Sequence, residues 1–132
     1  MSIVFKENVA LSIDQIIEVY DSSGINRPTK DRARIQQMFE HSDLVISAWD
    51  GKRLVGIARS LTDFNYACYL SDLAVHKDYQ HQGIGKTLIS KTRQLIGPQS
   101  MLLLIAAPTA VNYYPKLQME KVQNAFMYNR ES

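Results

Sequence analysis

The stretch "YLSDLAVHKDYQHQGIGKTLI", from Tyr69 to Ile89, carries the most specific pattern in this chain. It begins with a strand-like segment that ends at Val75 and closes on an apolar segment with helical spacing, and Gly83 and Gly85 lie between the two. The N–H groups at the start of a helix have no partners within the helix and attract negative charge, so a glycine-rich turn at this point can hold a phosphate group. The turn can also be a plain strand-to-helix connection, and the rest of the chain has to distinguish the two.

The residues before this stretch predict one strand and two helices. Residues 2–7 ("SIVFKE") are typical of a short strand. Ser12 followed by Gln15 forms a capping-box pattern, which opens a helix that we expect to end near Gly24. A polar loop at 25–30 ("INRPTK") then leads to a second helical stretch.

The period of the apolar residues then changes from that of a helix to that of strands. Residues 44–50 and 53–63 are strand-like runs, and Asp50-Gly51 between them is a strong hairpin signal. Residues 66–75 form a third run of the same kind. Three successive strands with short links predict an antiparallel meander.

The residues after the glycine-rich turn predict two more helices and two more strands. Residues 88–97 carry an apolar helical face, and residues 101–107 ("MLLLIAA") are a continuous apolar run, which predicts a strand buried on both faces. Residues 108–118 predict a short helix, and residues 121–129 predict a last strand. The order β-α-α-β-β-β-α-β-α-β predicts an α/β (α+β) fold built on a mixed sheet.

Length and composition restrict the class of protein. A chain of 132 residues predicts a single domain, and a net charge of +2 gives no support for a nucleic-acid-binding surface. The single cysteine, Cys68, and the absence of clustered metal-ligand residues predict no disulfide and no metal site. Apolar runs are far shorter than the roughly 20 residues that span a bilayer, and the N-terminus does not resemble a signal peptide. We therefore expect a cytoplasmic protein that binds neither nucleic acid nor membrane.

Two nucleotide-binding motifs fit the glycine-rich turn poorly. The P-loop pattern G-x-x-x-x-G-K-[ST] matches at Gly85, Lys86 and Thr87, but Gln80 stands where its first glycine should be. The dinucleotide pattern G-x-G-x-x-G needs a third glycine where this chain has Leu88. Neither motif is therefore the preferred interpretation.

A third pattern, Q-x-x-G-x-G at 80–85, resembles the Q/R-x-x-G-x-G/A signature of the GNAT superfamily of N-acetyltransferases. The opening stretch is similar to the central motif of that family almost throughout, and it looks most like that of the glucosamine-phosphate N-acetyltransferases. A second match, "AVNYYPKLQM" at 110–119, is similar to the family's A-x-x-F-Y-x-K-x-G-F. The resemblance implies one N-acetyltransferase domain over residues 1–132, with a GNAT-like, mostly antiparallel sheet and helices on both of its faces.

The resemblance also implies acetyl-CoA as the co-substrate. In this family acetyl-CoA lies in an opening between the two central parallel strands, here expected at 69–75 and 101–107. Backbone groups of the first strand would pair with the pantetheine arm, and amides of the glycine-rich turn would hold the pyrophosphate, which glycines allow to approach closely. The residues predicted to bind it are Leu73, Ala74, Val75, Gln80, His81, Gln82, Gly83, Ile84, Gly85, Lys86, Thr87 and Asn112.

For the chemistry, the resemblance implies direct transfer of the acetyl group to a primary amine. We expect a small acceptor, and the alternative is a protein or peptide acceptor. Tyr114 matches the tyrosine that commonly protonates the departing thiolate, and Tyr113 is expected to pack. A backbone N–H near Leu73 would polarise the carbonyl. Asp72 is a candidate base, and the alternatives are a structural carboxylate at a strand bulge and a water-mediated path through backbone groups. Several relatives place a glutamate where this chain has Ser71.

The sequence departs from the family pattern near its C-terminal end. Gln118 and Met119 replace a glycine and an aromatic residue, and Pro115 should end or kink the helix that contains the tyrosines. We expect the C-terminal strands to be shortened, which would open one side of the acceptor site or leave an edge for a second subunit to cover. The chain is accordingly expected to be a monomer or a homodimer.

The acceptor is expected near the loop at 25–30 and near Tyr66 and Tyr69, at the start of the third strand of the meander. A rival hypothesis is a non-catalytic acyl-CoA-binding regulatory module, which would keep the phosphate-binding turn and lack a competent base. Ser71 is the residue that favours this rival.

Overall fold

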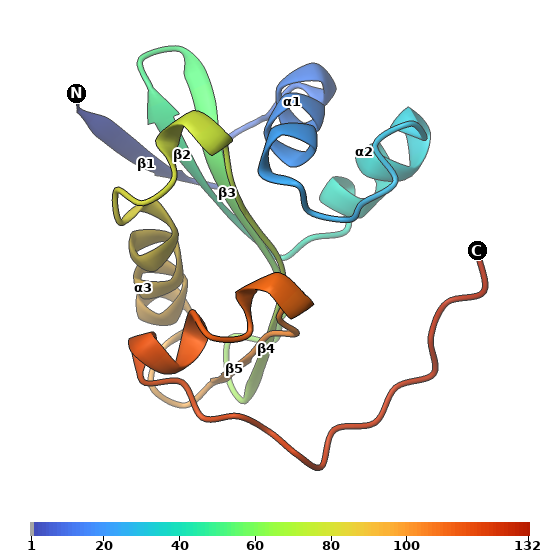
Figure 1. The fold of residues 1–132 in the computed structure, drawn as a ribbon, viewed down its shortest axis with the longest axis vertical. Helices are drawn as coiled ribbons and strands as arrows, with labels where there is room; N and C mark the ends of the chain where they lie inside the picture. Colours follow the sequence, from blue (N-terminus) through green and yellow to red (C-terminus); the bar gives the residue numbers. More distant parts are fainter. Residues whose placement is uncertain (1) are drawn as a thin grey trace.

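The computed structural model describes residues 2–132. The protein is built on a five-stranded sheet. Its strands are β1 (Ile3–Glu7), β2 (Leu44–Asp50), β3 (Arg53–Thr62), β4 (Ala67–Val75) and β5 (Met101–Leu103), and its helices are α1 (Ile13–Ser23), α2 (Arg32–Glu40) and α3 (Ile84–Ile96). The strands lie in the order β1-β2-β3-β4-β5, antiparallel up to β4, with β5 parallel to β4 (Figure 1). This confirms the predicted mixed, mostly antiparallel sheet and the predicted order of elements up to β5.

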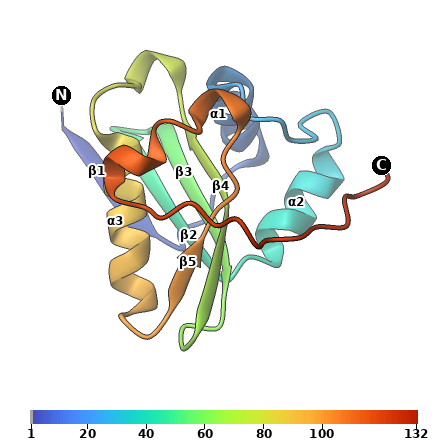
Figure 2. The ribbon, with the colours of Figure 1, turned by 60° about the horizontal axis from the view of Figure 1, so that its bottom comes forward.

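Helices cover both faces of the sheet, as predicted (Figures 1 and 2). α1 and α2 pack on one face around a core that includes Tyr20 and Ile35. α3 packs on the other face, where Leu88 and Ile96 join a second core with residues of β2, β3 and β4. The sheet therefore separates two apolar layers, one on the α1 side and one on the α3 side.

The predicted ends of α1 are confirmed. Ser12 Oγ accepts a hydrogen bond from the backbone N–H of Gln15 at 3.1 Å, which satisfies one of the unpaired donors of the first turn. At the other end Gly24 takes a left-handed conformation with φ of 82°, and its N–H bonds the carbonyl of Tyr20. These two caps set where the loop at 25–30 begins.

A β-bulge in β4 changes which of the following side chains face the α1 side of the sheet and which face the α3 side. Arg59 of β3 lies opposite Asp72, and Ser60 lies opposite Leu70, so Ser71 has no opposite residue on β3. Leu70 packs in the core on the α3 side, and in a regular strand a residue two places later would face the same way. Because the bulge inserts one residue, Asp72 instead points to the α1 side, where the hydroxyl of Tyr20 bonds it.

Gly56 of β3 allows the first turn of α3 to lie directly on the sheet. A Cβ at this position would come within 3.2 Å of Ile84 Cγ2, Leu88 Cδ1 and Ala48 Cβ, closer than ordinary contacts. The close approach fixes the N-terminal end of α3 against β3 and so positions the glycine-rich turn.

β5 differs from its prediction in length and in burial. The strand covers Met101–Leu103 only, and it pairs with β4 over Ala67–Tyr69. Met101 is 54% exposed and Ile105 is 64% exposed, so the prediction of a seven-residue strand buried on both faces was wrong. The reason is that β5 is the edge of the sheet, where an apolar run has a neighbouring strand on one side only.

The last two predicted elements, a helix and a strand, are not formed. Residues 108–118 contain two short 3₁₀ turns, η2 (Pro108–Ala110) and η3 (Tyr114–Leu117), because each begins at or beside a proline that cannot donate to an α-helical ladder. The predicted strand at 121–129 is an extended, exposed segment, which Figure 2 shows running past β5 towards α2. β5 ends at Leu103, and within residues 2–132 no strand of the sheet pairs with this segment.

Within residues 2–132, no helix combines the length and the apolar character that a membrane crossing requires.

Candidate functional site

The glycine-rich turn joins the end of β4 to the start of α3 through a short 3₁₀ turn, η1 (Lys77–Tyr79). Gly83 is the residue that caps α3, and its φ of 83° lies in the left-handed region that glycine adopts without strain. The N–H and the hydroxyl of Thr87 both donate to the carbonyl of Gly83, each at 3.0 Å, so the first turn of α3 is closed. The glycine at 83 is thus required by the conformation of the chain.

The start of α3 is a set of free hydrogen-bond donors. The backbone N–H groups from Gly83 to Lys86 have no carbonyl partner within the helix, because an α-helical N–H bonds the carbonyl four residues earlier. Among residues 2–132, no side chain caps this helix end, and its first turn holds no acidic residue. Since the helix dipole adds partial positive charge here, the turn is suited to an anion such as a phosphate group.

Gly85 is required neither by backbone conformation nor by the packing of the protein. A Cβ added to Gly85 would lie 3.5 Å from Tyr113 Oη and 3.8 Å from Val75 Cγ2, which are ordinary contact distances. Its φ lies outside the left-handed region. The missing side chain therefore leaves space on the surface of the turn that a ligand can use.

Gln80 and His81 shape the turn in different ways. The side-chain amide of Gln80 donates to the carbonyl of Val75 at 2.9 Å, so it ties the turn back to the end of β4. His81 takes a left-handed conformation with φ of 64° and is exposed, as is Gln82. Of the residues predicted to bind the cofactor, Gln80 has a side chain that braces the turn.

The other predicted cofactor residues lie along one surface of the same region. Ile84 is buried in the core on the α3 side, so only its backbone is available to a ligand. Lys86 is exposed, and Thr87 is partly exposed. Asn112 is exposed and precedes Tyr113, whose hydroxyl lies beside Gly85.

The C-terminal half of β4 has an edge that β5 does not cover. Within residues 2–132, β5 pairs with β4 only as far as Tyr69, so the strand from Leu70 to Val75 is free of β5. Leu73 and Val75 are partly buried against the core on the α3 side, and Ala74 is buried on the α1 side. The predicted site for an extended ligand arm is therefore an unpaired strand edge that leads to the glycine-rich turn.

The two tyrosines of the C-terminal motif take different places. Their rings meet edge to face with centroids 5.2 Å apart. Tyr114 packs against the core on the α3 side, whereas the hydroxyl of Tyr113 lies beside Gly85. Burial raises the pKa of both phenols, and Tyr113 raises that of Tyr114 further, so both are protonated at neutral pH. The sequence predicted that Tyr113 packs and did not predict its proximity to the turn; its side chain is 38% exposed, and it is the ring of Tyr114 that packs against the core.

Asp72 is at the centre of a buried hydrogen-bonded network. Its Oδ1 accepts from Arg27 Nε, and its Oδ2 accepts from Arg59 Nε and from the hydroxyl of Tyr20, each at 2.6 Å. Ser71 Oγ donates to Oδ1 at 3.0 Å. Burial alone would raise the pKa of Asp72, but the hydrogen bond and charge of Arg59, with Tyr20 and Arg27, outweigh it and hold that pKa below its usual value. A carboxylate held in this way is a weak proton acceptor, and these contacts speak against the predicted role of Asp72 as the base.

Three members of this network were missed at the level of the sequence: Tyr20, Arg27 and Arg59. Burial and the carboxylate of Asp72 raise the pKa of Tyr20 well above its usual value, so its hydroxyl stays a donor. The sequence does contain a signal for Arg59, which is a lone charge in the apolar strand "LVGIARSL". Because a buried arginine needs a partner, this pattern indicates a buried ion pair. Arg27 lies in the polar loop at 25–30, which gave no such signal.

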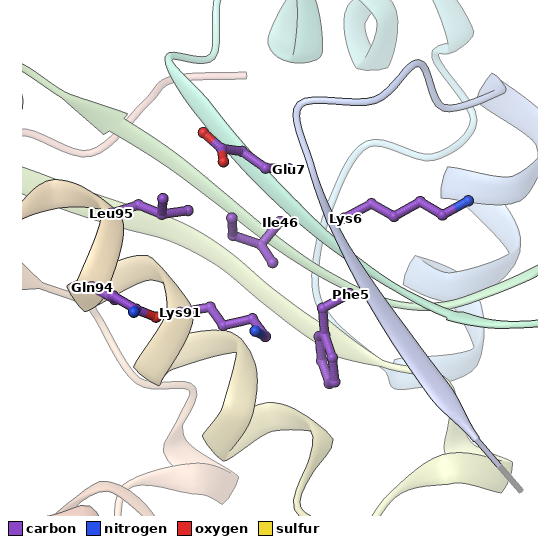
Figure 3. A pocket seen from close by; sticks show the side chains of 7 residues that line it. All are labelled: Phe5, Lys6, Glu7, Ile46, Lys91, Gln94 and Leu95. Atoms are coloured by element: carbon purple, nitrogen blue, oxygen red, sulfur yellow. The ribbon is translucent and has the colours of Figure 1, made fainter.

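A separate hollow of about 180 Å³ lies between β1 and α3 (Figure 3). It is lined by Phe5, Lys6, Glu7, Ile46, Lys91, Gln94 and Leu95, and Figure 3 shows Lys6 pointing away from it. Its α3 residues belong to the C-terminal half of the helix, at the end remote from Gly83. Among residues 2–132, no group of three or more histidine, cysteine or acidic side chains is arranged to hold a metal ion.

Comparisons with known proteins agree with this geometry. Residues 16–129 match the family model described as an acetyltransferase (GNAT) domain. The uncharacterized N-acetyltransferase ycf52 of Porphyra purpurea is 30% identical to the chain, over 91% of this chain and 74% of its own length.

Two solved structures share the fold. A probable acetyltransferase of unknown function from meticillin-resistant Staphylococcus aureus superposes with a TM-score of 0.83 at 20% identity, covering 98% of this chain and 99% of its own. The PaiA N-acetyltransferase of Thermoplasma acidophilum, solved in complex with coenzyme A, superposes with a TM-score of 0.69 at 19% identity, covering 96% of this chain and 94% of its own.

Proposed function

The chain belongs to the GNAT acetyltransferase family, and on this premise we propose that it transfers the acetyl group of acetyl-CoA directly to a primary amine of a small acceptor. We also propose that residues 1–132 act as one N-acetyltransferase domain. The observation that carries the proposal is the N-terminus of α3, where no side chain within residues 2–132 caps the backbone N–H groups. Gly85 leaves open space there, although neither its backbone conformation nor the packing requires a glycine at this position. The solved structure of PaiA with coenzyme A supports the choice of ligand.

The residues present fit coenzyme A at two places. The backbone N–H groups from His81 to Lys86 would bind its pyrophosphate, because they combine free donors with the positive end of the helix dipole. The unpaired edge of β4 from Leu73 to Val75 would bind its extended arm by backbone hydrogen bonds. Acetyl-CoA supplies an activated thioester, and the chain supplies position and charge stabilisation.

The acceptor amine must attack as a neutral nitrogen, form the C–N bond and displace the thiolate, which then takes up a proton. A backbone N–H near Leu73 would stabilise the charge that develops on the carbonyl oxygen. Tyr114 would give the proton to the thiolate, since its raised pKa keeps the hydroxyl protonated. Because Asp72 is engaged by two arginines and a tyrosine, the amine would lose its proton through water and backbone groups instead.

The experiment is a screen of primary amines with acetyl-CoA, in which release of the CoA thiol is followed in steady state. We expect turnover with at least one amine and a fall in kcat of at least about 100-fold for Tyr114→Phe, as loss of a general acid produces. Tyr113→Phe is the matched control and should lose less than about tenfold. A larger loss for Tyr113→Phe would transfer the acid role to the hydroxyl beside Gly85. Tight CoA binding without turnover across the screen would support a binding module instead.

A further inference from the structure

Two guanidinium groups share a single carboxylate at the bulge of β4. Arg27 and Arg59 each place Nε 2.6 Å from an oxygen of Asp72. Within residues 2–132, no second carboxylate lies within 4.0 Å of either guanidinium. Tyr20, the remaining member of the network, keeps its proton because its pKa is raised. The cluster therefore carries about one unit of positive charge that nothing in it neutralises.

Arg59 is the internal partner of Asp72. Its side chain is 8% exposed, and its Nη groups donate to the carbonyl of Met38 and to the hydroxyls of Ser42 and Ser71. Its guanidinium also lies over the ring of Phe39, 5.7 Å from the centroid. With its donors turned inward, Arg59 is not available to a ligand.

The surplus positive charge of the cluster is accessible from solvent at Arg27. Its side chain is 26% exposed and comes from the loop between α1 and α2. Three contacts hold the guanidinium in place: Nε to Asp72, Nη1 to the carbonyl of Asn26 at 2.7 Å, and Nη2 to the carbonyl of Ser71 at 2.7 Å. A guanidinium has five N–H donors, so one N–H on each Nη is left for a ligand. Arg27 is thus a fixed cation with two spare donors.

The location of Arg27 relates it to the proposed reaction. It bonds the carbonyl of Ser71, and Leu73, whose N–H is proposed to polarise the acetyl carbonyl, is two residues further along β4. Two residues of strand span at most about 7 Å, and somewhat less across the bulge at Ser71, which is the length of a small amine. An acceptor with its nitrogen at the proposed reaction centre would reach Arg27 with its other end.

We infer that Arg27 is a specificity-determining residue for acceptors that carry an anionic oxygen group, a carboxylate or a phosphate, at the end opposite their amine. The inference rests on the proposed function, and it names the substrate class that the site selects. Unlike charges attract at a partly buried site, and a guanidinium with two free donors can bind two oxygens of one anion. The same surplus charge repels an acceptor that bears a second ammonium group.

The test uses sets of three amines with the same carbon chain, ending in a carboxylate, a carboxamide or a second ammonium group. For the wild-type protein we expect kcat/KM for the carboxylate to exceed that for the diamine by at least about tenfold, with the carboxamide between them. Arg27→Gln should bring the three values within about threefold of one another, mainly by loss of the carboxylate's advantage. Arg27→Lys keeps the charge and should keep the order. Arg93→Gln removes one charge from the exposed surface of α3 and should leave the ratios unchanged.

The ratio separates specificity from a structural role, because a merely distorted site would lose activity towards all three amines alike. A wild-type preference for the diamine, or an unchanged ratio in Arg27→Gln, overturns the inference even if the protein turns over amines. Calorimetric binding of the same amines to the CoA-loaded protein gives a second readout that needs no turnover, and absence of a carboxylate preference there overturns it as well. Failure of the proposed function is distinct, since it appears as no CoA binding or no thiol release with any amine. If Arg27→Gln does not fold, the order seen with Arg27→Lys and the wild type decides.

Discussion

The two glycines at the N-terminal end of α3 differ in whether the fold needs them. Gly83 adopts a φ of 83°, which a residue with a side chain takes only with strain. Gly85 has an ordinary φ and room for a Cβ. The two glycines look equivalent in the sequence, and their difference predicts opposite effects of the same substitution.

Gly83→Ala should lower the free energy of unfolding by about 1–2 kcal/mol, which is the usual cost of left-handed geometry for a residue with a Cβ. Gly85→Ala should leave stability unchanged or raise it by up to about 1 kcal/mol, because alanine is the better helix former. It should nevertheless weaken CoA binding by at least about tenfold, since the methyl group fills the space that the phosphates need. Urea unfolding and calorimetry with CoA measure the two effects. Unaltered CoA affinity in Gly85→Ala would contradict the proposed use of that space.

Asp72 is another single residue on which the fold depends, because its carboxylate pairs with the buried Arg59 and the partly buried Arg27. Asp72→Asn should lower the free energy of unfolding at pH 7 by about 3–5 kcal/mol, because it leaves Arg59 without its ion-pair partner. The folded pKa of Asp72 lies below the unfolded value of about 3.9, so its contribution is complete above that pH. As the pH falls through the folded pKa the contribution is lost.

The gap between wild type and Asp72→Asn should accordingly shrink in urea unfolding below about pH 4. The pH dependence of kcat/KM should keep its shape in the variant if Asp72 has only this structural role. A variant as stable as the wild type with a large fall in kcat would instead restore Asp72 as the base.

At the scale of elements, the bulge in β4 determines which layers Asp72 and Leu73 face. Ser71 has no opposite residue on β3, and this extra residue turns Asp72 to the α1 side while Leu73 packs on the α3 side. If Ser71 instead held a regular place opposite a residue of β3, the carboxylate of Asp72 would point into the apolar core below α3. The bulge therefore accommodates Ser71 while Asp72 keeps its place in the network and Leu73 keeps its place at the proposed reaction edge.

Deletion of Ser71 tests this interpretation of the bulge. We expect the deletion variant to unfold cooperatively in circular dichroism, because Leu70 stays opposite Ser60 and Asp72 stays opposite Arg59, so every side chain keeps its layer. The variant loses the hydrogen bond from Arg27 Nη2 to the carbonyl of Ser71 and should be moderately less stable than the wild type. Ser71→Ala keeps the inserted residue and loses only the hydroxyl contacts to Arg59 and Asp72, so it should cost about 1–2 kcal/mol. Loss of cooperative unfolding in the deletion variant would show that β4 needs the extra residue to pair with β3.

For the whole molecule, ligand binding should raise global stability. A ligand that binds only the folded protein adds about 2.7 kcal/mol at 100 times its Kd, which corresponds to a rise in Tm of several degrees for a chain of this size. CoA should produce this rise, and ATP with magnesium should not, because the P-loop pattern lacks its first glycine at Gln80. Thermal melts at matched ligand concentrations make the comparison. Equal protection by ATP with magnesium would favour the nucleotide-binding interpretation over the proposed function.

The local sequence determined the sheet up to β5, its three helices and the turn that opens α3. The signals for these elements are local: an N-cap at Ser12, a left-handed stop at Gly24, a hairpin at Asp50-Gly51 and an apolar period that changes from helix to strand. The same kind of local signal predicted a helix at 108–118 and a strand at 121–129, and both were wrong. A strand needs a neighbour to pair with, and propensity alone does not supply one.

Only the tertiary structure decided how the site is built. The bulge that aims Asp72, the pairing of Arg27 and Arg59 with it, and the position of Tyr113 beside Gly85 all join residues far apart in the sequence. Such contacts depend on strand register and on the close approach of α3 to Gly56, which no pattern within one segment records. The sequence thus identified the family and the turn that we propose binds phosphate, because both reside in one continuous stretch. The surplus charge at Arg27, which we propose selects the acceptor, arises only when the loop after α1 folds onto β4.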